Sequence, residues 1–148
     1  MRIVLQRVRS ASVTVDQRQT GAIAKGYLLL VGVERTDTPD VCLRLAQKIT
    51  KLRVFPDATG RLSLTLREVG GAVLVVSQFT LLADLQKGNR PDFHRAAPPA
   101  EAKALYHEFI TCLARELGPD APAIQTGEFG ADMQVQLVND GPLTLLLD

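Results

Sequence analysis

Polar groups that could take part in chemistry are most concentrated in the stretch Ser77, Gln78, Phe79 and Thr80. Two hydroxyl groups and one amide occur within four positions, directly after the apolar run 72–76. A valine-rich apolar run of this length predicts a buried strand. Polar groups at the end of a rigid buried strand need hydrogen-bond partners, so the sequence predicts a cleft at this point of the fold.

A nucleophile at Thr80 or Ser77 would need a base within hydrogen-bond reach. The sequence holds two histidines, His94 and His107, and His94 falls in the segment that follows Thr80. The GxSxG pattern is absent, and no acid completes a recognisable triad. The residues alone therefore leave a nucleophile at Thr80, assisted by His94, as an open alternative.

The dipeptide Gly141-Pro142 is a second feature that bears on function. It belongs to Asn139-Asp140-Gly141-Pro142, whose composition predicts a turn between two strands. A plain turn explains this spacing. A cis bond before the proline is the alternative, since it would present two neighbouring carbonyl oxygens in a fixed direction and so sense the shape of a substrate.

Metal and nucleotide sites find no support in the sequence. HExxH, GxGxxG and P-loop patterns are absent, so we expect neither a metal nor another cofactor. Asp132 and Asp140 resemble ordinary acids at strand ends. Cys42 and Cys112 lie at apolar positions of helical patterns and lack CxxC spacing, which predicts buried thiols rather than ligands or a disulfide.

The elements that must position these residues can be read from hydrophobic periodicity. Apolar residues at helical spacing predict a helix that is capped by Thr38 and ends near Lys51, and a second helix over 99–117. Strand patterns, mostly connected by hairpins, cover 2–9, 11–16, 27–33, 53–55, 62–66, 72–76, 128–138 and 143–147. The sequence therefore predicts an α+β fold with mostly antiparallel sheet and two main helices.

Length and composition limit the broad class of protein. A chain of 148 residues fits a single domain, residues 1–148, and 46% hydrophobic against 22% charged residues predicts a globular protein. No apolar run approaches the roughly 20 residues of a membrane span. The first residues lack the pattern of a signal peptide, so we expect a cytoplasmic protein. The net charge of +1 gives no general nucleic-acid footprint, although one local basic patch comprises Lys87, Arg90, His94 and Arg95.

Two stretches together resemble the signature motifs of the D-aminoacyl-tRNA deacylases, or D-tyrosyl-tRNA deacylases. These are Ser77-Gln78-Phe79-Thr80-Leu81 and Asn139-Asp140-Gly141-Pro142-Leu143-Thr144, in the family's order. The chain departs from the family at Leu143, usually Val, and at Asp92, usually Ser. Further similar stretches are Gln6-Arg7-Val8, Ala11-Ser12-Val13-Thr14-Val15, Lys87-Gly88, Arg90-Pro91, Phe93, Gln125-Thr126-Gly127 and Ala131-Asp132-Met133-Gln134-Val135.

This resemblance implies a hydrolase that proofreads translation by cleaving D-amino acids from the 3′ end of tRNA. It implies a homodimer in which Gly141-Pro142, expected to be cis, enters the pocket of the other subunit and rejects L-amino acids. Ser77, Gln78, Phe79 and Thr80 would form the catalytic wall. Arg7, holding the Gly-Pro backbone, and Met133 would belong to the substrate-selecting side.

The resemblance also implies that the terminal 2′-hydroxyl of the tRNA assists catalysis and that glycyl-tRNA is a further substrate. Backbone N–H groups near Phe79 and Thr80 could stabilise the developing oxyanion. Two other functions remain as alternatives. One is a small-ester hydrolase that uses Thr80 with His94, and the other is a non-catalytic dimeric RNA-binding module.

Overall fold

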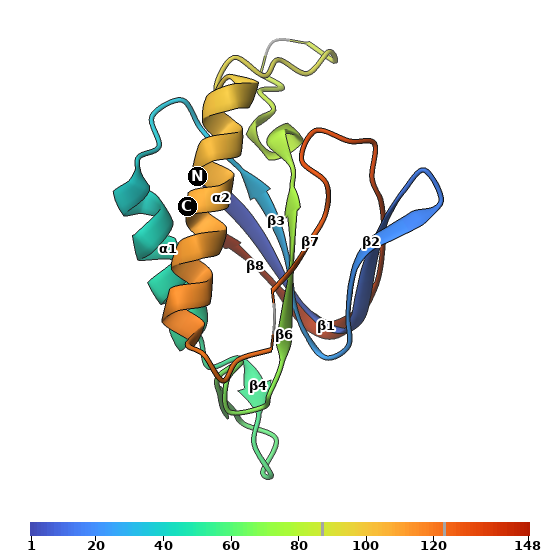
Figure 1. Ribbon diagram of the computed structural model, residues 1–148, viewed down its shortest axis with the longest axis vertical. Helices are drawn as coiled ribbons and strands as arrows, with labels where there is room; N and C mark the ends of the chain where they lie inside the picture. Colours follow the sequence, from blue (N-terminus) through green and yellow to red (C-terminus); the bar gives the residue numbers. More distant parts are fainter. Residues whose placement is uncertain (87, 123) are drawn as a thin grey trace.

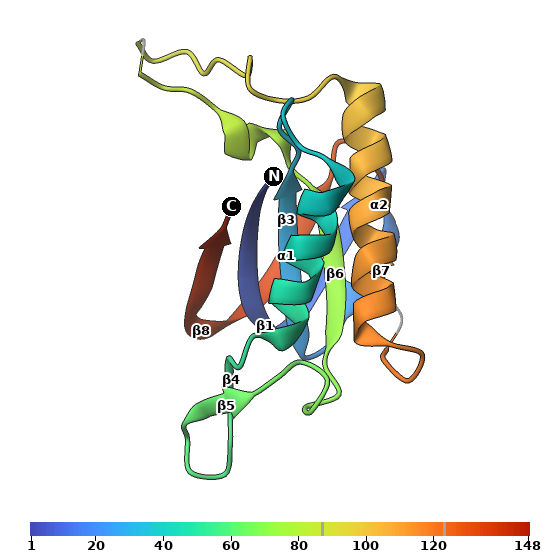
Figure 2. The ribbon, with the colours of Figure 1, turned by 90° about the vertical axis from the view of Figure 1, so that its left-hand side faces the viewer.

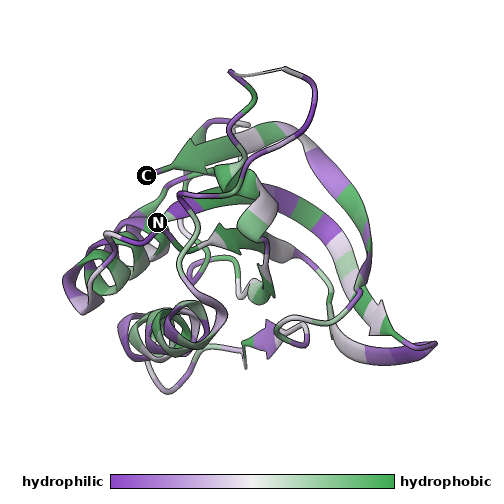
Figure 3. Ribbon diagram, turned by 90° about the horizontal axis from the view of Figure 1, so that it is seen from above, coloured by the Kyte–Doolittle hydropathy of each residue, from purple (hydrophilic) through white to green (hydrophobic). Residues whose placement is uncertain are grey.

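The computed structural model describes residues 1–86, 88–122 and 124–148, and places both helices on one side of a curved sheet (Figure 1). Seen from above, the sheet curls away from the helices, and its strands carry alternating hydrophilic and hydrophobic bands (Figure 3). The helices are α1 (Pro39–Lys51), α2 (Pro99–Leu117) and the 3-10 helix η1 (Phe79–Leu82). The strands are β1 (Arg2–Val15), β2 (Arg18–Ile23), β3 (Gly26–Gly32), β4 (Phe55–Pro56), β5 (Leu62–Leu64), β6 (Ala72–Ser77), β7 (Gln125–Thr126) and β8 (Gln134–Leu147).

The long strand β1 organises the sheet. Its first half pairs with β3, its second half pairs with β2, and β8 runs antiparallel to it along nearly its whole length. The prediction of two separate strands, 2–9 and 11–16, was wrong. The pairing with β8 shifts register between Gln6 and Val8 and again between Val8 and Ser10, so bulges absorb the break in alternation and the strand continues.

The inner part of the sheet is parallel. β3 pairs with β6 and β6 with β7, all in the same direction, and the two helices form the crossovers between them. Hairpin connections are therefore fewer than the sequence suggested, because a parallel pair needs a long crossover. The predicted class is confirmed: two helices cover a mixed sheet whose pairs are mostly antiparallel. Figure 2 shows α1 and α2 side by side in front of this sheet.

Two apolar clusters lie on opposite faces of β3, so this strand is covered on both sides. The larger cluster joins the helices to the sheet and contains Tyr27, Phe55, Tyr106 and Phe109. The smaller one lies on the face away from the helices. Both cysteines are buried as predicted, and burial raises the pKa of the Cys42 thiol to about 11, which makes it a poor nucleophile at neutral pH.

Both helices lie where the sequence placed them, with a difference at the start of α1. The Thr38 side chain makes no capping hydrogen bond; its carbonyl accepts from the Val41 amide at 3.0 Å. The α2 helix ends at Gly118, which has φ of +85° and thereby adopts a backbone conformation that glycine favours. Within the described residues neither helix is long and apolar enough to cross a membrane.

The C-terminal third differs most from the sequence prediction. The segment 128–133 is not a strand, and β8 begins only at Gln134. The residues 139–142 do not form a hairpin turn, because β8 passes through them and both of its halves pair with β1. The predicted strands at 53–55 and 62–66 shrink to Phe55–Pro56 and Leu62–Leu64, which pair only with each other.

The two buried tyrosines generate a prediction about stability. The Tyr106 hydroxyl donates to the Val75 carbonyl at 2.9 Å, whereas the Tyr27 hydroxyl, also buried, has no hydrogen-bond partner among the described residues. We expect Tyr106→Phe to lower the free energy of unfolding by about 1 kcal/mol, because a buried hydrogen bond is lost. Tyr27→Phe removes no hydrogen bond and should leave this free energy equal or higher. Urea unfolding of both variants measures the difference, and an equal loss in both would contradict it.

Candidate functional site

The polar stretch after β6 forms a tight helical turn rather than an extended strand end. Gln78 leaves the sheet after its amide donates to the Val31 carbonyl at 2.7 Å. The 3-10 helix Phe79–Leu82 follows, closed by a hydrogen bond of 3.3 Å from the Leu81 amide to the Gln78 carbonyl. Leu82 is fully buried and anchors this turn to the core, while Phe79 stays 56% exposed. The polar residues are therefore held on a rigid element that faces outward.

A cavity of about 750 Å³ lies beside this turn, at the carboxyl ends of the parallel strands β3 and β6. Open parallel sheets commonly bind ligands at this edge. Its wall comes from five parts of the chain: the end of β3, the end of β6, the segment before α2, the start of α2, and the segment before and into β8. The lining residues are Val31, Val33, Arg35, Val76, Ser77, Gln78, Phe79, Phe93, Ala96, Ala97, Pro98, Pro99, Ala102, Phe129, Gly130, Ala131, Asp132, Met133 and Val135.

The structure brings together some of the residues that the sequence singled out and separates others. Ser77, Gln78, Phe79 and Met133 line the cavity, and Thr80 is joined to them through a hydrogen bond from the Gln78 amide group to its hydroxyl. The other three predicted site residues do not line it: these are Arg7, Gly141 and Pro142. One chain therefore supplies the cavity without the glycine-proline pair.

Sequence reasoning missed several residues of the cavity. Arg35 follows β3, and Phe129 lies in a segment that was assigned to a strand. No motif marks either residue, because each reaches the cavity through the tertiary fold. Their contribution is nevertheless distinct: Arg35 is the one cation among the described lining residues, and Asp132 is the one anion.

No hydrogen bond joins His94 to Thr80 among the described residues. The His94 Nδ1 atom lies 3.0 Å from an Asp92 carboxylate oxygen, and its backbone amide donates to the same carboxylate at 2.9 Å. These two hydrogen bonds, the backbone one foremost, lower the pKa of Asp92. The Thr80 hydroxyl instead accepts the hydrogen bond from Gln78. Among the described residues no group of three His, Cys, Asp or Glu side chains gathers as metal ligands.

The start of η1 offers hydrogen-bond donors. The amide groups of Phe79 and Thr80 make no hydrogen bond to another group of the described chain. Free amides at the beginning of a helical turn point away from it and attract negative charge. They suit an oxygen atom that becomes negative during a reaction.

The segment after η1, described over residues 83–86 and 88–98, forms a lip beside the cavity, which is lined by its residues Phe93, Ala96, Ala97 and Pro98. Its two arms pair through Asp84 and Asp92, and the Phe93 ring packs against Phe79 with centroids 5.0 Å apart. The Arg35 Nε atom donates to the His94 carbonyl at 2.7 Å, which ties the lip to the end of β3. The predicted basic patch is only partly free, since Arg95 pairs with Glu34 at 3.0 Å, and Lys87 lies outside the described residues.

Gly141 and Pro142 protrude from β8 and are exposed. The bond between them is cis. On either side the strand is anchored: Leu143 is buried, and Asp140 meets Arg7, whose Nε atom lies 2.9 Å from the carboxylate and 3.2 Å from the main-chain carbonyl of Asp140. We call Gly141 and Pro142 the protrusion.

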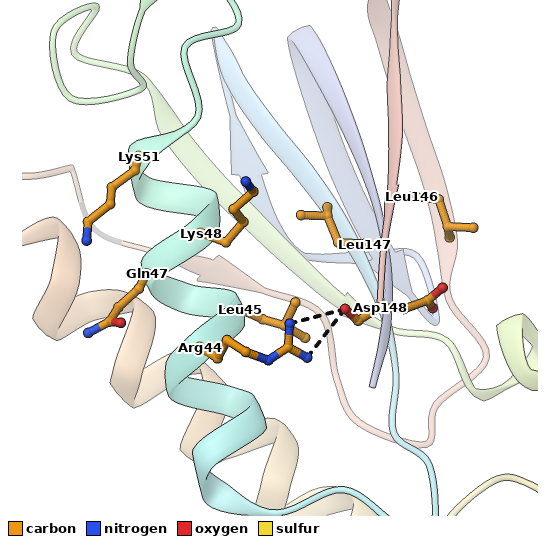
Figure 4. Close-up of a pocket in the computed structure, with 8 residues that line it drawn as sticks. All are labelled: Arg44, Leu45, Gln47, Lys48, Lys51, Leu146, Leu147 and Asp148. Carbon is orange, nitrogen blue, oxygen red and sulfur yellow. Dashed lines mark hydrogen bonds between the residues drawn. The ribbon is translucent and has the colours of Figure 1, made fainter.

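A second cavity of about 620 Å³ lies between α1 and the end of β8 (Figure 4). Arg44, Lys48 and Lys51 line its α1 side, and the Arg44 guanidinium donates twice to the Asp148 carbonyl at 3.3 Å. Basic residues in the last turn of a helix interact favourably with its dipole, which accounts for Lys48 and Lys51. It shares no lining residue with the cavity beside η1.

Comparisons with known proteins agree with one another. A family model described as "D-Tyr-tRNA(Tyr) deacylase" matches residues 4–148. The chain is 51% identical over 147 residues to a D-aminoacyl-tRNA deacylase of Saccharophagus degradans, covering 99% of both proteins. It is 55% identical over 148 residues to a D-aminoacyl-tRNA deacylase of Anaeromyxobacter dehalogenans, covering 100% of this chain and 97% of the relative.

Solved structures share the fold. A structure named "c-Myc DNA Unwinding Element Binding Protein" superposes with a TM-score of 0.92 at 42% identity, covering 100% of this chain and 98% of the other. A probable eukaryotic D-amino acid tRNA deacylase superposes with a TM-score of 0.82 at 17% identity, covering 99% and 97% of the two chains. At that identity the second match shows the fold alone.

The pairing of Arg7 with Asp140 predicts a large effect of a small change. Asp140→Asn keeps the shape of the side chain but leaves the buried Arg7 guanidinium without its carboxylate. Because Asp140 is itself 25% exposed, we expect a loss of about 1–3 kcal/mol in the free energy of unfolding, less than for a fully buried pair. Asp132→Asn, at an exposed acid with no ion pair in the described chain, is the matched control. Chemical denaturation distinguishes the two, and equal stabilities would contradict the prediction.

Proposed function

This chain belongs to the D-aminoacyl-tRNA deacylase family, whose members are hydrolases of the aminoacyl-tRNA ester bond, and we propose that it removes D-amino acids from tRNA as a homodimer. In this proposal the protrusion of one subunit enters the cavity of the other. The aminoacyl ester at the 3′ end of the tRNA lies between them. L-amino acids are excluded there by the two carbonyl groups of the protrusion.

One observation carries this proposal: each chain holds a cavity and an exposed protrusion that does not line that cavity. An isologous dimer supplies two protrusions to two cavities with a single kind of contact. The family resemblance of both motifs supports the same pairing. The rejection needs no particular side chain from the protrusion, because fixed backbone carbonyls exclude an L side chain by steric clash.

The chemistry proposed for the cavity depends on backbone groups and on the substrate. The free amides of Phe79 and Thr80 would stabilise the negative oxygen of the tetrahedral intermediate. An aminoacyl ester is already activated, so such a site suffices without a protein nucleophile. The 2′-hydroxyl of the terminal adenosine would assist the attack of water. The described lining contains no histidine, cysteine or lysine, which supports a role for the substrate's own hydroxyl.

Two further properties follow from steric rejection. Glycine has no side chain to exclude, so glycyl-tRNA should be a substrate as well. Contact with the tRNA should be confined to its acceptor end, because the net charge of +1 gives little general attraction to RNA. We place the protein in the cytoplasm, where it would serve quality control of translation.

Substrate chirality is the direct test of this function. With D-tyrosyl-, glycyl- and L-tyrosyl-tRNA at equal concentration, we expect kcat/KM for the first two to exceed that for the last by roughly a hundredfold or more, because only the L side chain clashes. Release of the labelled amino acid measures the rates. Comparable rates on the D and L forms would rule out chiral proofreading. Binding of all three without release would favour a non-catalytic RNA-binding module.

The source of the catalytic hydroxyl can be tested separately. We expect Thr80→Ala and His94→Ala to keep kcat within about threefold of the original chain, because neither side chain is required as nucleophile or base. A D-aminoacyl-tRNA with a 2′-deoxy terminal adenosine should instead lose about two orders of magnitude or more. Single-turnover hydrolysis measures both. Loss of activity in Thr80→Ala with normal cleavage of the deoxy substrate would reverse the assignment and favour the small-ester hydrolase.

A further inference from the structure

We infer that Phe55 is a positioning residue for the protrusion, acting through Arg7. The inference rests on the proposed function, in which the protrusion rejects L-amino acids. Phe55 belongs to the short strand β4, far from the protrusion in sequence and outside both signature motifs. Three contacts connect it with Asp140, the residue that precedes the protrusion.

The first connection is the burial of Arg7. Among the described residues Arg7 is the one charged residue buried as a whole, with 6% of its surface exposed. A buried guanidinium is tolerated only when its N–H groups and its charge have partners. Asp140 meets it on one side, with its carboxylate at 2.9 Å and its carbonyl at 3.2 Å from Nε. The guanidinium of Arg7 therefore helps to determine where Asp140 lies, together with the exposed Arg9, whose Nε atom is 3.5 Å from the carboxylate.

The second connection joins Arg7 to Val54 and Phe55. The Arg7 Nη1 atom donates to the carbonyl of Val54, and its guanidinium carbon lies 5.9 Å from the centre of the Phe55 ring, over which the Lys25 ammonium also lies, at 5.3 Å. A planar guanidinium over an aromatic face gains a cation–π attraction that grows when the pair is removed from water. Val54 and Phe55 thus hold the guanidinium that Asp140 contacts.

The third connection is the packing of Phe55 against Tyr27, which fixes the position of the Phe55 ring. The ring is fully buried and stacks on Tyr27 with centroids 5.3 Å apart and planes at 22°. Tyr27 is the direct partner of Arg7 in the pairing of β1 with β3, so the two side chains project from the same face. Burial raises the pKa of Tyr27, and the charge of Arg7 opposes this shift, which agrees with their proximity. Tyr27, Phe55 and Arg7 form a packed stack beneath Asp140.

This stack matters for specificity because the carbonyl groups of the protrusion must face the substrate within a narrow range of directions. A displacement of about 1 Å in a positioned group can change a rate roughly a hundredfold. Gly141 has open space around it: apart from its chain neighbours, a Cβ atom added there would meet one group within 4 Å, the Asn139 amide nitrogen at 3.4 Å. The direction of the protrusion is therefore determined by its two flanking residues, Asp140 and Leu143. The position of Asp140 depends in turn on Arg7 and Phe55.

Phe55→Leu tests the inference, since leucine stays apolar but offers no flat face to the guanidinium. Phe109→Leu is the matched control: Phe109 is equally buried in the same cluster, but lies on α2, and the described cation–aromatic contacts of Arg7 involve Phe55 alone. We expect the D-to-L ratio of kcat/KM to fall roughly tenfold in Phe55→Leu through faster cleavage of L-tyrosyl-tRNA, and to stay unchanged in Phe109→Leu. Amide hydrogen exchange over residues 139–143 should also be faster in Phe55→Leu than in Phe109→Leu.

Two more variants separate positioning from mere stability. Tyr27→Phe keeps the ring stack and removes a hydroxyl without a partner, so the ratio should not change. In a protein that already carries Arg7→Lys, Phe55→Leu should change the D-to-L ratio little further, because the effects of residues that act through one another are not additive.

The inference is overturned if Phe55→Leu and Phe109→Leu show the same ratio and the same exchange over 139–143. A chain without substitutions that cleaves both chiral forms equally would overturn the proposed function. In that case the exchange comparison still decides whether Phe55 holds the protrusion.

Discussion

The pairing of β8 with β1 is the constraint on which the arrangement of the site depends. It runs from Gln134 opposite Thr14 to Leu147 opposite Ile3, so the strand cannot move as a flexible arm. The protrusion interrupts this ladder, between the pairs formed by Asn139 and Thr144. It is thereby fixed outside the cavity of its own chain, which lies at the carboxyl ends of β3 and β6. A partner subunit is the simplest source of a protrusion for that cavity.

The position of the protrusion within the β8–β1 pairing also explains why the charged side chain of Arg7 is buried. An exposed protrusion of two residues has little surface to bury, so its direction must come from neighbours. Arg7 provides this by gathering a carboxylate, two main-chain carbonyls and an aromatic face around one guanidinium. Such a buried pair is weak support for stability but can fix one geometry. Rigidity at this point suits a site that distinguishes mirror-image substrates.

The sequence predicted those features that local periodicity and capping determine. Both helices, the buried strand β6 and the two buried cysteines follow directly from apolar spacing. The continuity of β1 and of β8 could not be predicted, because bulges carry both strands across residues that break the alternation. Of the residues that line the cavity, the sequence had identified only Ser77, Gln78, Phe79 and Met133 as site residues. Arg35 and Phe129 reach it through the crossover loops, and Phe55 reaches Arg7 through packing, which no motif records.

The most direct test of a site shared between two chains is complementation between subunits. One variant carries Gly141→Leu, at a position where an added Cβ meets only Asn139 apart from its chain neighbours, to block entry of the protrusion; the other carries Ala131→Trp, to obstruct the cavity that Ala131 lines. Each alone should be inactive on D-tyrosyl-tRNA. Co-expressed with different tags and purified through both tags, they should form mixed dimers with one intact site of two, restoring about half of the original activity per subunit. Mixed dimers with no more activity than the separate variants would contradict a site built from two chains.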